Sequence, residues 1–331
     1  MPNTFGKAVT YSLLGLWSAI CLVPICWTAI TSLKSIGDID QPPGFLPFVD
    51  FTPSLDAWRF ILFAHNENLV TRFINSAVIG GAATVLTLVI SGMAIYGLTR
   101  FPPAIRWAPA AAMVLGCGLA TVPVPGLLPR LALAGVALAS LVLAITLRGR
   151  GPVMSASGVI SLMLATRILP PVVLVLPLYM MAVASGTRDT WAVMIFVYTA
   201  INVPVAVWLL LPVLGPRAME QEEAAQLDGA SHLGIFFTIL LPMVRTGFAA
   251  AGLIVFLMCW NEYLFAAYLT ADQALTLPPW AVGQLSLKEA QIGGEAEEWA
   301  HLSAATMLMM VPALAFSAFV QKHLARGAFG R

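Results

Sequence analysis

Charged residues are scarce in this chain. Lys, Arg, Asp and Glu make up 10% of its 331 residues, whereas soluble globular domains have about 25% charged residues. Hydrophobic residues make up 59% of the sequence, and the mean hydropathy is +0.87. The net charge is +1 and the basic residues are scattered singly, so no basic stripe could bind the phosphates of a nucleic acid. The composition therefore indicates an integral membrane protein.

Cysteine and histidine are also rare, with four residues of each. The cysteines lie in apolar runs without C-x-x-C spacing, which favours buried thiols, and the histidines are dispersed over loops and span ends. We therefore predict no metal site and no catalytic residue. The four cysteines are Cys21, Cys26, Cys117 and Cys259, and the four histidines are His65, His232, His301 and His323.

Long apolar runs dominate the chain. A helix needs about 20 apolar residues to cross a hydrocarbon layer of about 30 Å. Six runs meet this requirement: 8–33, 70–99, 153–184, 191–213, 246–270 and 301–320. The first run is longer than the core of a signal peptide and lacks an obvious cleavage site, so we expect it to stay as a membrane anchor. The sequence predicts an all-α membrane protein.

A further apolar block, 107–147, lies between the second and third spans. Its centre reads TVPVPGLLPR, and the prolines there predict a turn. We expect an inserted helical hairpin, which raises the prediction to eight spans and leaves every later segment on its original side. No internal repeat or separate soluble domain is evident, so residues 1–331 are expected to form one transmembrane domain.

The basic residues favour an orientation with both termini in the cytoplasm. With that orientation, the cytoplasmic set is Lys7, Arg100, Arg106, Arg148, Arg150, Arg217, Arg245, Lys322, Arg326 and Arg331, and the outer set is Lys34, Arg59, Arg72, Arg130, Arg188 and Lys288. Residues 216–245 then form a cytoplasmic loop.

This loop, residues 216–245, which we call the EAA segment, contains EEAAQLDGASHLGIFFTILLP. Helix formers over 219–227 predict a short helix that ends at Asp228-Gly229, because Gly adopts the left-handed conformation that closes a helix. Ser231 can cap a second helix over 232–240, and Pro242 leads back to the membrane. An amphipathic loop that rests on the lipid headgroups is the alternative.

The spacing of this segment resembles the EAA loop of bacterial ABC importer permeases. The matching residues are Glu223, Ala224, Ala225, Gly229, Ile239, Leu241 and Pro242, with Asp228 next to the glycine. FINSAVIGG from Phe73, ATRILPPVVLVLPLYM from Ala165 and WNEYLFAAYLT from Trp260 extend the resemblance to carbohydrate-type permeases similar to those of the maltose transporter. The resemblance implies a type I permease fold with six core helices, to which the hairpin is an addition.

The resemblance also implies partners. The EAA helix of such permeases docks on ATP-binding cassette subunits, here expected in two copies that bind ATP and Mg, and the chain has no G-x-x-x-x-G-K-[ST] loop of its own. A second permease subunit and an extracytoplasmic solute-binding protein are also implied, with a sugar or polyol as substrate. The chain itself is then a transport subunit without enzymatic activity, in a bacterial inner membrane.

Two charged residues lie well inside the six predicted spans, away from their ends: Arg167 and Glu262. Each lies on the order of 21–23 Å along its helix from the cytoplasmic end, because a helix rises about 1.5 Å per residue. We hypothesise that the two approach each other or line one polar cavity in the translocation pathway. Trp260 and Asn261 would offer a sugar a stacking face and hydrogen bonds.

A structural alternative for the same two charges stays open. Arg167 can bond backbone carbonyls freed by Pro170 and Pro171, while Glu262 caps a neighbouring helix.

Two other functions of the whole protein also stay open. A secondary transporter should carry ion-coupling carboxylates or symmetric broken helices, and an intramembrane enzyme needs a nucleophile with its base or a metal set. Neither pattern is clear in the sequence.

Overall fold

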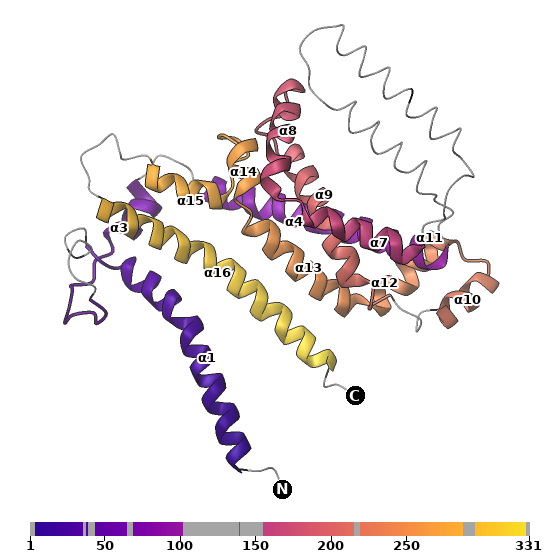
Figure 1. Ribbon diagram of the computed structural model, residues 1–331, viewed down its shortest axis with the longest axis horizontal. Coiled ribbons are helices and arrows are strands. Elements are labelled where there is room, and N and C mark those ends of the chain that lie inside the picture. Colours follow the sequence, from indigo (N-terminus) through magenta and orange to yellow (C-terminus); the bar gives the residue numbers. More distant parts are fainter. Residues whose placement is uncertain are drawn as a thin grey trace. The chain divides into compact units, whose positions relative to one another are not determined.

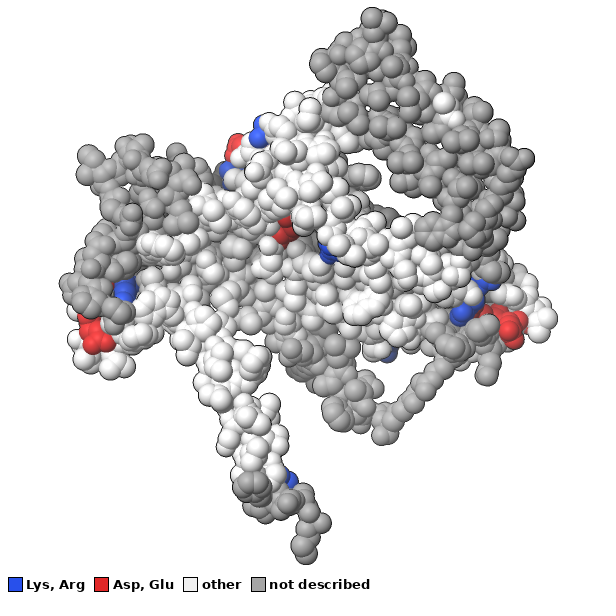
Figure 2. Space-filling model, in the orientation of Figure 1, with Lys and Arg blue, Asp and Glu red and all other residues white. Residues whose placement is uncertain are grey.

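The structure is a computed structural model that describes residues 4–35, 38, 44–64, 69–101, 139, 155–214, 219–286 and 295–328. Among these residues the regular structure is helical, apart from one isolated bridge between Pro47 and Phe51. On the face shown in Figure 2, charged side chains are few and uncharged surface dominates. The prediction of an all-α protein is confirmed for the described residues.

The chain divides into two compact units, residues 1–74 with 277–315 and residues 75–276 with 316–331. Helices α4 (Leu69–Arg100) and α16 (Glu295–Ala328) each continue from one unit into the other. The first unit also contains α1 (Thr4–Thr31), α3 (Asp56–Arg59), η1 (Phe60–Ala64) and α15 (Leu277–Ser286).

Aromatic contacts of charged and polar side chains hold the first unit together. The Lys34 ammonium lies 5.4 Å from the Trp27 ring centroid and 5.3 Å from that of Phe51, and only 6% of this lysine is exposed. Such cation–π contacts stabilise an ammonium that has left water. The ring of His301 stacks on Phe60 at 4.1 Å, so this histidine is a packing residue.

The second unit carries most of the remaining helices (Figure 1). They are α7 (Ala156–Ala165), η2 (Thr166–Ile168), α8 (Pro171–Ala184), α9 (Trp191–Leu210), α10 (Met219–Leu227), α11 (His232–Gly234), η4 (Ile235–Leu240), α12 (Leu241–Met243), α13 (Arg245–Trp260) and α14 (Leu264–Leu269). One core cluster joins α4, α8, α9, α13 and α14. A second cluster joins α4, α7, α9, η4 and α13, so it connects the EAA segment to membrane helices.

Two helical segments are sharply bent, one within the predicted span 153–184 and one just before the predicted span 246–270. The helices over Ala156–Ile168 and Pro171–Ala184 meet at 86°, because Pro170 disfavours a helical Leu169, whose ψ is 127°. The segments His232–Met243 and Arg245–Trp260 meet at 84°, where Val244 leaves helical geometry with φ −102° and ψ 15°. No residue pattern predicted the second bend.

Three described helices are long and apolar enough to cross a membrane, or five if each bent pair is one span. One of them is α1, and no residue of its apolar stretch Gly6–Thr31 is buried inside the protein. A shorter apolar stretch, Trp299–Ala315, lies in α16 at the sixth predicted span. The predicted hairpin at 107–147 lies outside the described residues, apart from Ala139, so the total of eight spans stays a prediction.

Candidate functional site

The first helix of the EAA segment has the predicted bounds. Helix α10 spans Met219–Leu227, and Gly229 follows with φ +82°. The Gly229 N–H donates to the Gln226 carbonyl and the Ala230 N–H to the Ala225 carbonyl, both at 3.0 Å. This pair of bonds is the Schellman arrangement that closes a helix through a left-handed residue. The bend predicted at Asp228-Gly229 is confirmed.

The second helix of the segment begins at the predicted cap. The Ser231 hydroxyl accepts a hydrogen bond from the Gly234 N–H at 3.2 Å, and α11 follows directly. The chain then forms the π-helical turn η4 and the short helix α12, so helical structure runs to Met243, three residues beyond the predicted end. The EAA segment is a helix–turn–helix.

One face of α10 is fully open. Glu223, Ala224 and Asp228 are exposed, and Leu227 is 90% exposed, whereas Ala225 packs against the core. Glu223 and Leu227 are four residues apart and so share a helix face. A carboxylate beside an unburied leucine suits a partner groove that has a basic rim and an apolar floor. Leu227 was not among the residues predicted from the sequence, although its i, i+4 spacing from Glu223 could have revealed it.

The neighbouring acid, Glu222, has a different environment. It is 2% exposed and forms a forked ion pair with Arg100, the last residue of α4: Arg100 Nε donates to one carboxylate oxygen at 2.7 Å and Nη2 to the other at 2.6 Å. This pair was not predicted from the sequence. The only signal for it in the sequence is that the predicted topology places Arg100, at the end of a span, and Glu222, in the loop, on the same side of the membrane.

The second helix of the segment is also attached to α4. The Tyr96 hydroxyl lies 3.3 Å from Nδ1 of His232, and the Phe101 ring meets the His232 ring edge-on at 5.0 Å. The buried side chain of Phe236 lies beside Tyr96, with ring centroids 5.8 Å apart. Both arms of the EAA segment therefore contact the Arg100 end of α4.

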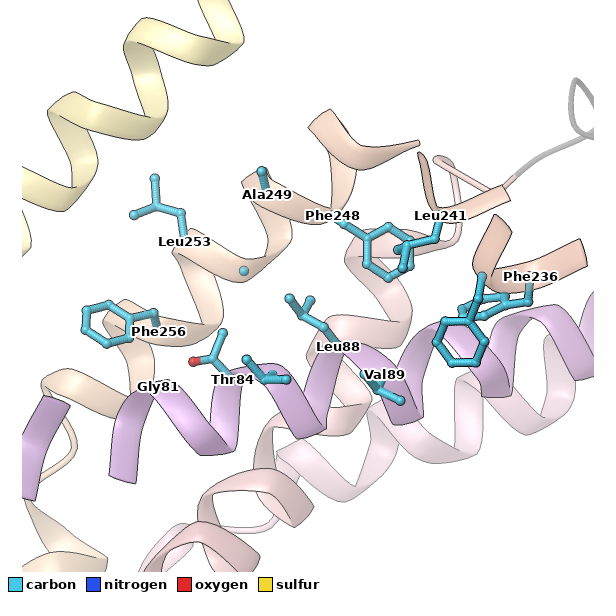
Figure 3. Close-up of a pocket in the computed structure, with 13 residues that line it drawn as sticks. Gly81, Thr84, Leu88, Val89, Phe236, Leu241, Phe248, Ala249, Leu253 and Phe256 are labelled. Atoms are coloured by element: carbon cyan, nitrogen blue, oxygen red, sulfur yellow. The ribbon is translucent and has the colours of Figure 1, made fainter. Parts of the chain in front are cut away.

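The remaining motif residues lead into the membrane helices. Ile239 and Leu241 pack against the second core cluster, and Pro242 is exposed in the first turn of α12. Leu241 also lines an apolar cavity of about 590 Å³, across which side chains of α4 and α13 face each other (Figure 3). Among the described residues that line it, the one polar side chain is that of Thr84, whose hydroxyl donates to the Gly80 carbonyl at 2.7 Å. This lining offers little for hydrogen bonding to a sugar.

The two charged residues of the predicted pathway do not bond each other. Arg167 Nη2 donates to Oδ1 of Asn202 at 3.3 Å, and the Glu262 carboxylate accepts the Phe265 and Ala266 N–H groups at 2.9 and 3.1 Å. Arg167 and Glu262 thus have other partners, and the hypothesised pair between them is not formed. Glu262 caps α14, as the structural alternative predicted, whereas Arg167 bonds a side chain and not freed carbonyls.

Arg167 lines a cavity. Its guanidinium borders a space of about 480 Å³ where η2 turns into α8. The ring of Trp260 is 1% exposed, so it presents no open stacking face here, and the exposed Asn261 donates its side-chain N–H to the Leu257 carbonyl at 2.8 Å. Among the described residues no group of three His, Cys, Asp or Glu side chains could hold a metal ion.

A second polar network, which the sequence analysis missed, joins two connections of the second unit. The Asp189 carboxylate accepts the N–H groups of four successive residues, 271–274, at 2.9 to 3.0 Å, and Asp189 itself has φ +62°. Burial raises the pKa of Asp189, but the four backbone bonds outweigh it, so its pKa lies below the usual value. This carboxylate fixes the α8–α9 connection to the chain after α14.

Membrane-spanning helices and a helix–turn–helix held at the end of one of them fit the permease class of transport protein. A family profile, described as the inner membrane component of binding-protein-dependent transport systems, matches residues 135–329. This match covers more than half of the chain, so the chain belongs to that family. It is a multi-pass membrane protein and a transport subunit.

Relatives of this chain match it over nearly its whole length. A diacetylchitobiose uptake system permease of Streptomyces coelicolor is 26% identical over 96% of this chain and 86% of that protein. A melibiose/raffinose/stachyose import permease of Bacillus subtilis is 27% identical over 92% and 88%. A bacterial ABC transporter involved in the import of the acidic polysaccharide alginate has a chain that matches with TM-score 0.59 over 96% of each chain at 18% identity, which shows a shared fold.

Proposed function

We propose that this chain is a permease subunit of an ATP-driven importer for a sugar or sugar-like solute. The observation that carries the proposal is the EAA segment, which forms a bent helix pair that is attached to a membrane helix and whose first helix has an exposed face. The names of the relatives support a sugar, since they are permeases for diacetylchitobiose, for melibiose, raffinose and stachyose, and for trehalose and maltose. The alginate importer with the similar fold also takes up a carbohydrate polymer.

The proposed topology is a single transmembrane domain, 1–331, in a bacterial inner membrane. It has six core spans of the type I permease fold and the inserted hairpin 107–147, with both termini and residues 216–245 in the cytoplasm. The bias of basic residues supports this orientation. A carbohydrate importer with a matching fold supports the permease core.

The coupling role belongs to the exposed and hinge residues of the EAA segment. Glu223 would bond a basic residue of an ATPase subunit, Ala224 and Ala225 permit close approach, and Gly229 makes the bend. Asp228, Ile239, Leu241 and Pro242 connect this surface to α12 and α13. A displacement of α10 by the ATPase would thereby reach the membrane helices.

The proposed complex has further subunits. Two ATP-binding cassette subunits would bind ATP and Mg, a second permease would complete the pathway, and a solute-binding protein would deliver the substrate outside. Arg167, Trp260, Asn261 and Glu262 stay candidates for the pathway, and the cavity beside Arg167 supports the first of them. The Trp260 ring is buried, so it could contact a sugar only in a second conformation of the protein.

Uptake measurements test the sugar assignment. Cells with and without the gene for this chain are given labelled diacetylchitobiose, melibiose, raffinose, trehalose or maltose. We expect deletion to abolish ATP-dependent uptake of at least one sugar and the intact chain to restore it. Unchanged uptake of the whole panel would contradict a sugar from this group.

A further inference from the structure

Two successive glutamates of α10 have different surroundings. Neighbouring residues on an α-helix are about 100° apart, and Glu223 is accordingly exposed while Glu222 is buried against the end of α4. Both oxygens of the Glu222 carboxylate accept from one guanidinium, that of Arg100, at 2.6 and 2.7 Å. A forked pair of this kind fixes orientation as well as distance.

The chain itself connects α10 to α13 less directly than the Arg100–Glu222 pair connects α10 to α4. It passes the left-handed Gly229, the single-residue cap Ser231 and the 84° bend at Val244. Each of these points can absorb a change of backbone angle. The Arg100–Glu222 pair bypasses all three, because it joins α10 to α4 through side chains 122 positions apart in the sequence.

The surroundings of the pair also favour a fixed attachment. Tyr96 and Phe101, on either side of Arg100 in the chain, contact His232 in the second helix of the EAA segment. Loss of either charged partner would leave the other buried and unpaired, which is strongly unfavourable. Breaking the pair would therefore cost free energy, which favours a permanent contact between α10 and α4.

We propose that Arg100 is a positioning residue for ATPase coupling, and that its pair with Glu222 makes α10 and the Arg100 end of α4 move as one body. The inference rests on the proposed function, since an ATPase would supply the displacement of α10. It adds a second path for that displacement, into α4, to the path through α12 and α13. Glu223 faces the partner and Glu222 faces the permease.

Spin labels on α4 and α10 test the attachment. The labelling sites are Gly97→Cys and Gln226→Cys, in a chain whose four native cysteines are replaced by alanine. A Cβ at Gly97 meets nothing within 4 Å and Gln226 is exposed, so both sites accept a label. The distance distribution is measured by pulsed electron paramagnetic resonance in the complex purified from native membrane, without nucleotide and with ATP and vanadate.

We expect one narrow distance that is the same in both nucleotide states. Glu222→Gln, and Arg100→Lys as a milder variant that keeps the charge but loses the fork, should lose the narrow peak. The exchange of Arg100→Glu with Glu222→Arg should restore it, and Glu223→Gln, the adjacent control, should keep it. A wild-type distance that shifts with ATP, or a narrow peak in both Glu222→Gln and Arg100→Lys, would overturn the inference.

The two proposals fail separately in this experiment. Absence of an ATPase from the purified wild-type complex would contradict the proposed function. The comparison of wild type with Glu222→Gln without nucleotide would still decide whether the pair holds α10 to α4.

Discussion

Gly229 sets the bend of the EAA segment through its backbone angle alone. Its φ is +82°, and a Cβ placed there meets nothing within 4 Å, so the obstacle to other residues is conformational. We expect Gly229→Val to destabilise the bend by about 1–3 kcal/mol and to lower the yield of co-purified ATPase. Gly229→Asn should retain most of the yield, because asparagine tolerates the left-handed region. Gly97→Ala, at an open helical position, is the control, and equal yields for Val and Asn would contradict this account.

Asp189 makes the stability of the second unit depend on pH. Its pKa is lowered in the folded chain, so its stabilising contribution is present above the usual carboxyl pKa of about 3.9 and is lost as the pH falls through the lowered value. We expect Asp189→Asn to lower the free energy of unfolding in detergent by about 1–3 kcal/mol at neutral pH. The difference from wild type should shrink as the pH falls through the lowered pKa of Asp189. Glu223→Gln, which removes an exposed carboxylate, should show no such pattern, and a pH-independent difference for Asp189→Asn would argue against the ionised acceptor.

At the scale of elements, α10 presents its outer face to a partner. Leu227 is 90% exposed, so its replacement by aspartate removes no packing inside the chain. We expect Leu227→Asp to reduce ATPase co-purification by at least about tenfold, as for an apolar residue at the centre of an interface, with an unchanged melting temperature. The control is Gln226→Asp, which adds the same charge at an exposed neighbouring residue of α10. A lower melting temperature for Leu227→Asp would show a packing role instead.

The elements that local sequence encodes were predicted well. The bounds of α10, the left-handed Gly229 and the Ser231 cap follow from helix propensity and capping, which act within a few residues. The bend before Pro171 has a local cause as well, but the length of the apolar run 153–184 hid it because proline is tolerated in membrane helices.

The contacts between elements could not be predicted in the same way. Arg100 and Glu222 are 122 positions apart, and no local pattern pairs them. The hypothesised Arg167–Glu262 pair rested on similar depth along two straight helices. The helices break at Pro170 and at Asn261, and Glu262 turns to the N–H groups of its own next helix. Depth alone therefore did not determine the partner.

For the whole molecule, the orientation in the membrane and the inserted hairpin 107–147 are predictions that chemical labelling can test. We expect Gly126→Cys, in a chain whose native cysteines are replaced, to react with an impermeant thiol reagent added outside intact cells. Gln226→Cys, on the proposed cytoplasmic α10, should react only after the cells are opened. Labelling of Gly126→Cys only in opened cells would contradict the hairpin or its orientation.

The central claim is that this chain transmits the work of a separate ATPase through the EAA segment. The most direct test is the subunit composition of the complex purified through a tag on this chain from its native membrane, measured by mass spectrometry of the intact assembly. The account predicts one second permease and two ATP-binding cassette subunits per chain, and their loss in Glu223→Lys. A lone, transport-active homo-oligomer of this chain, without an ATPase, would contradict it.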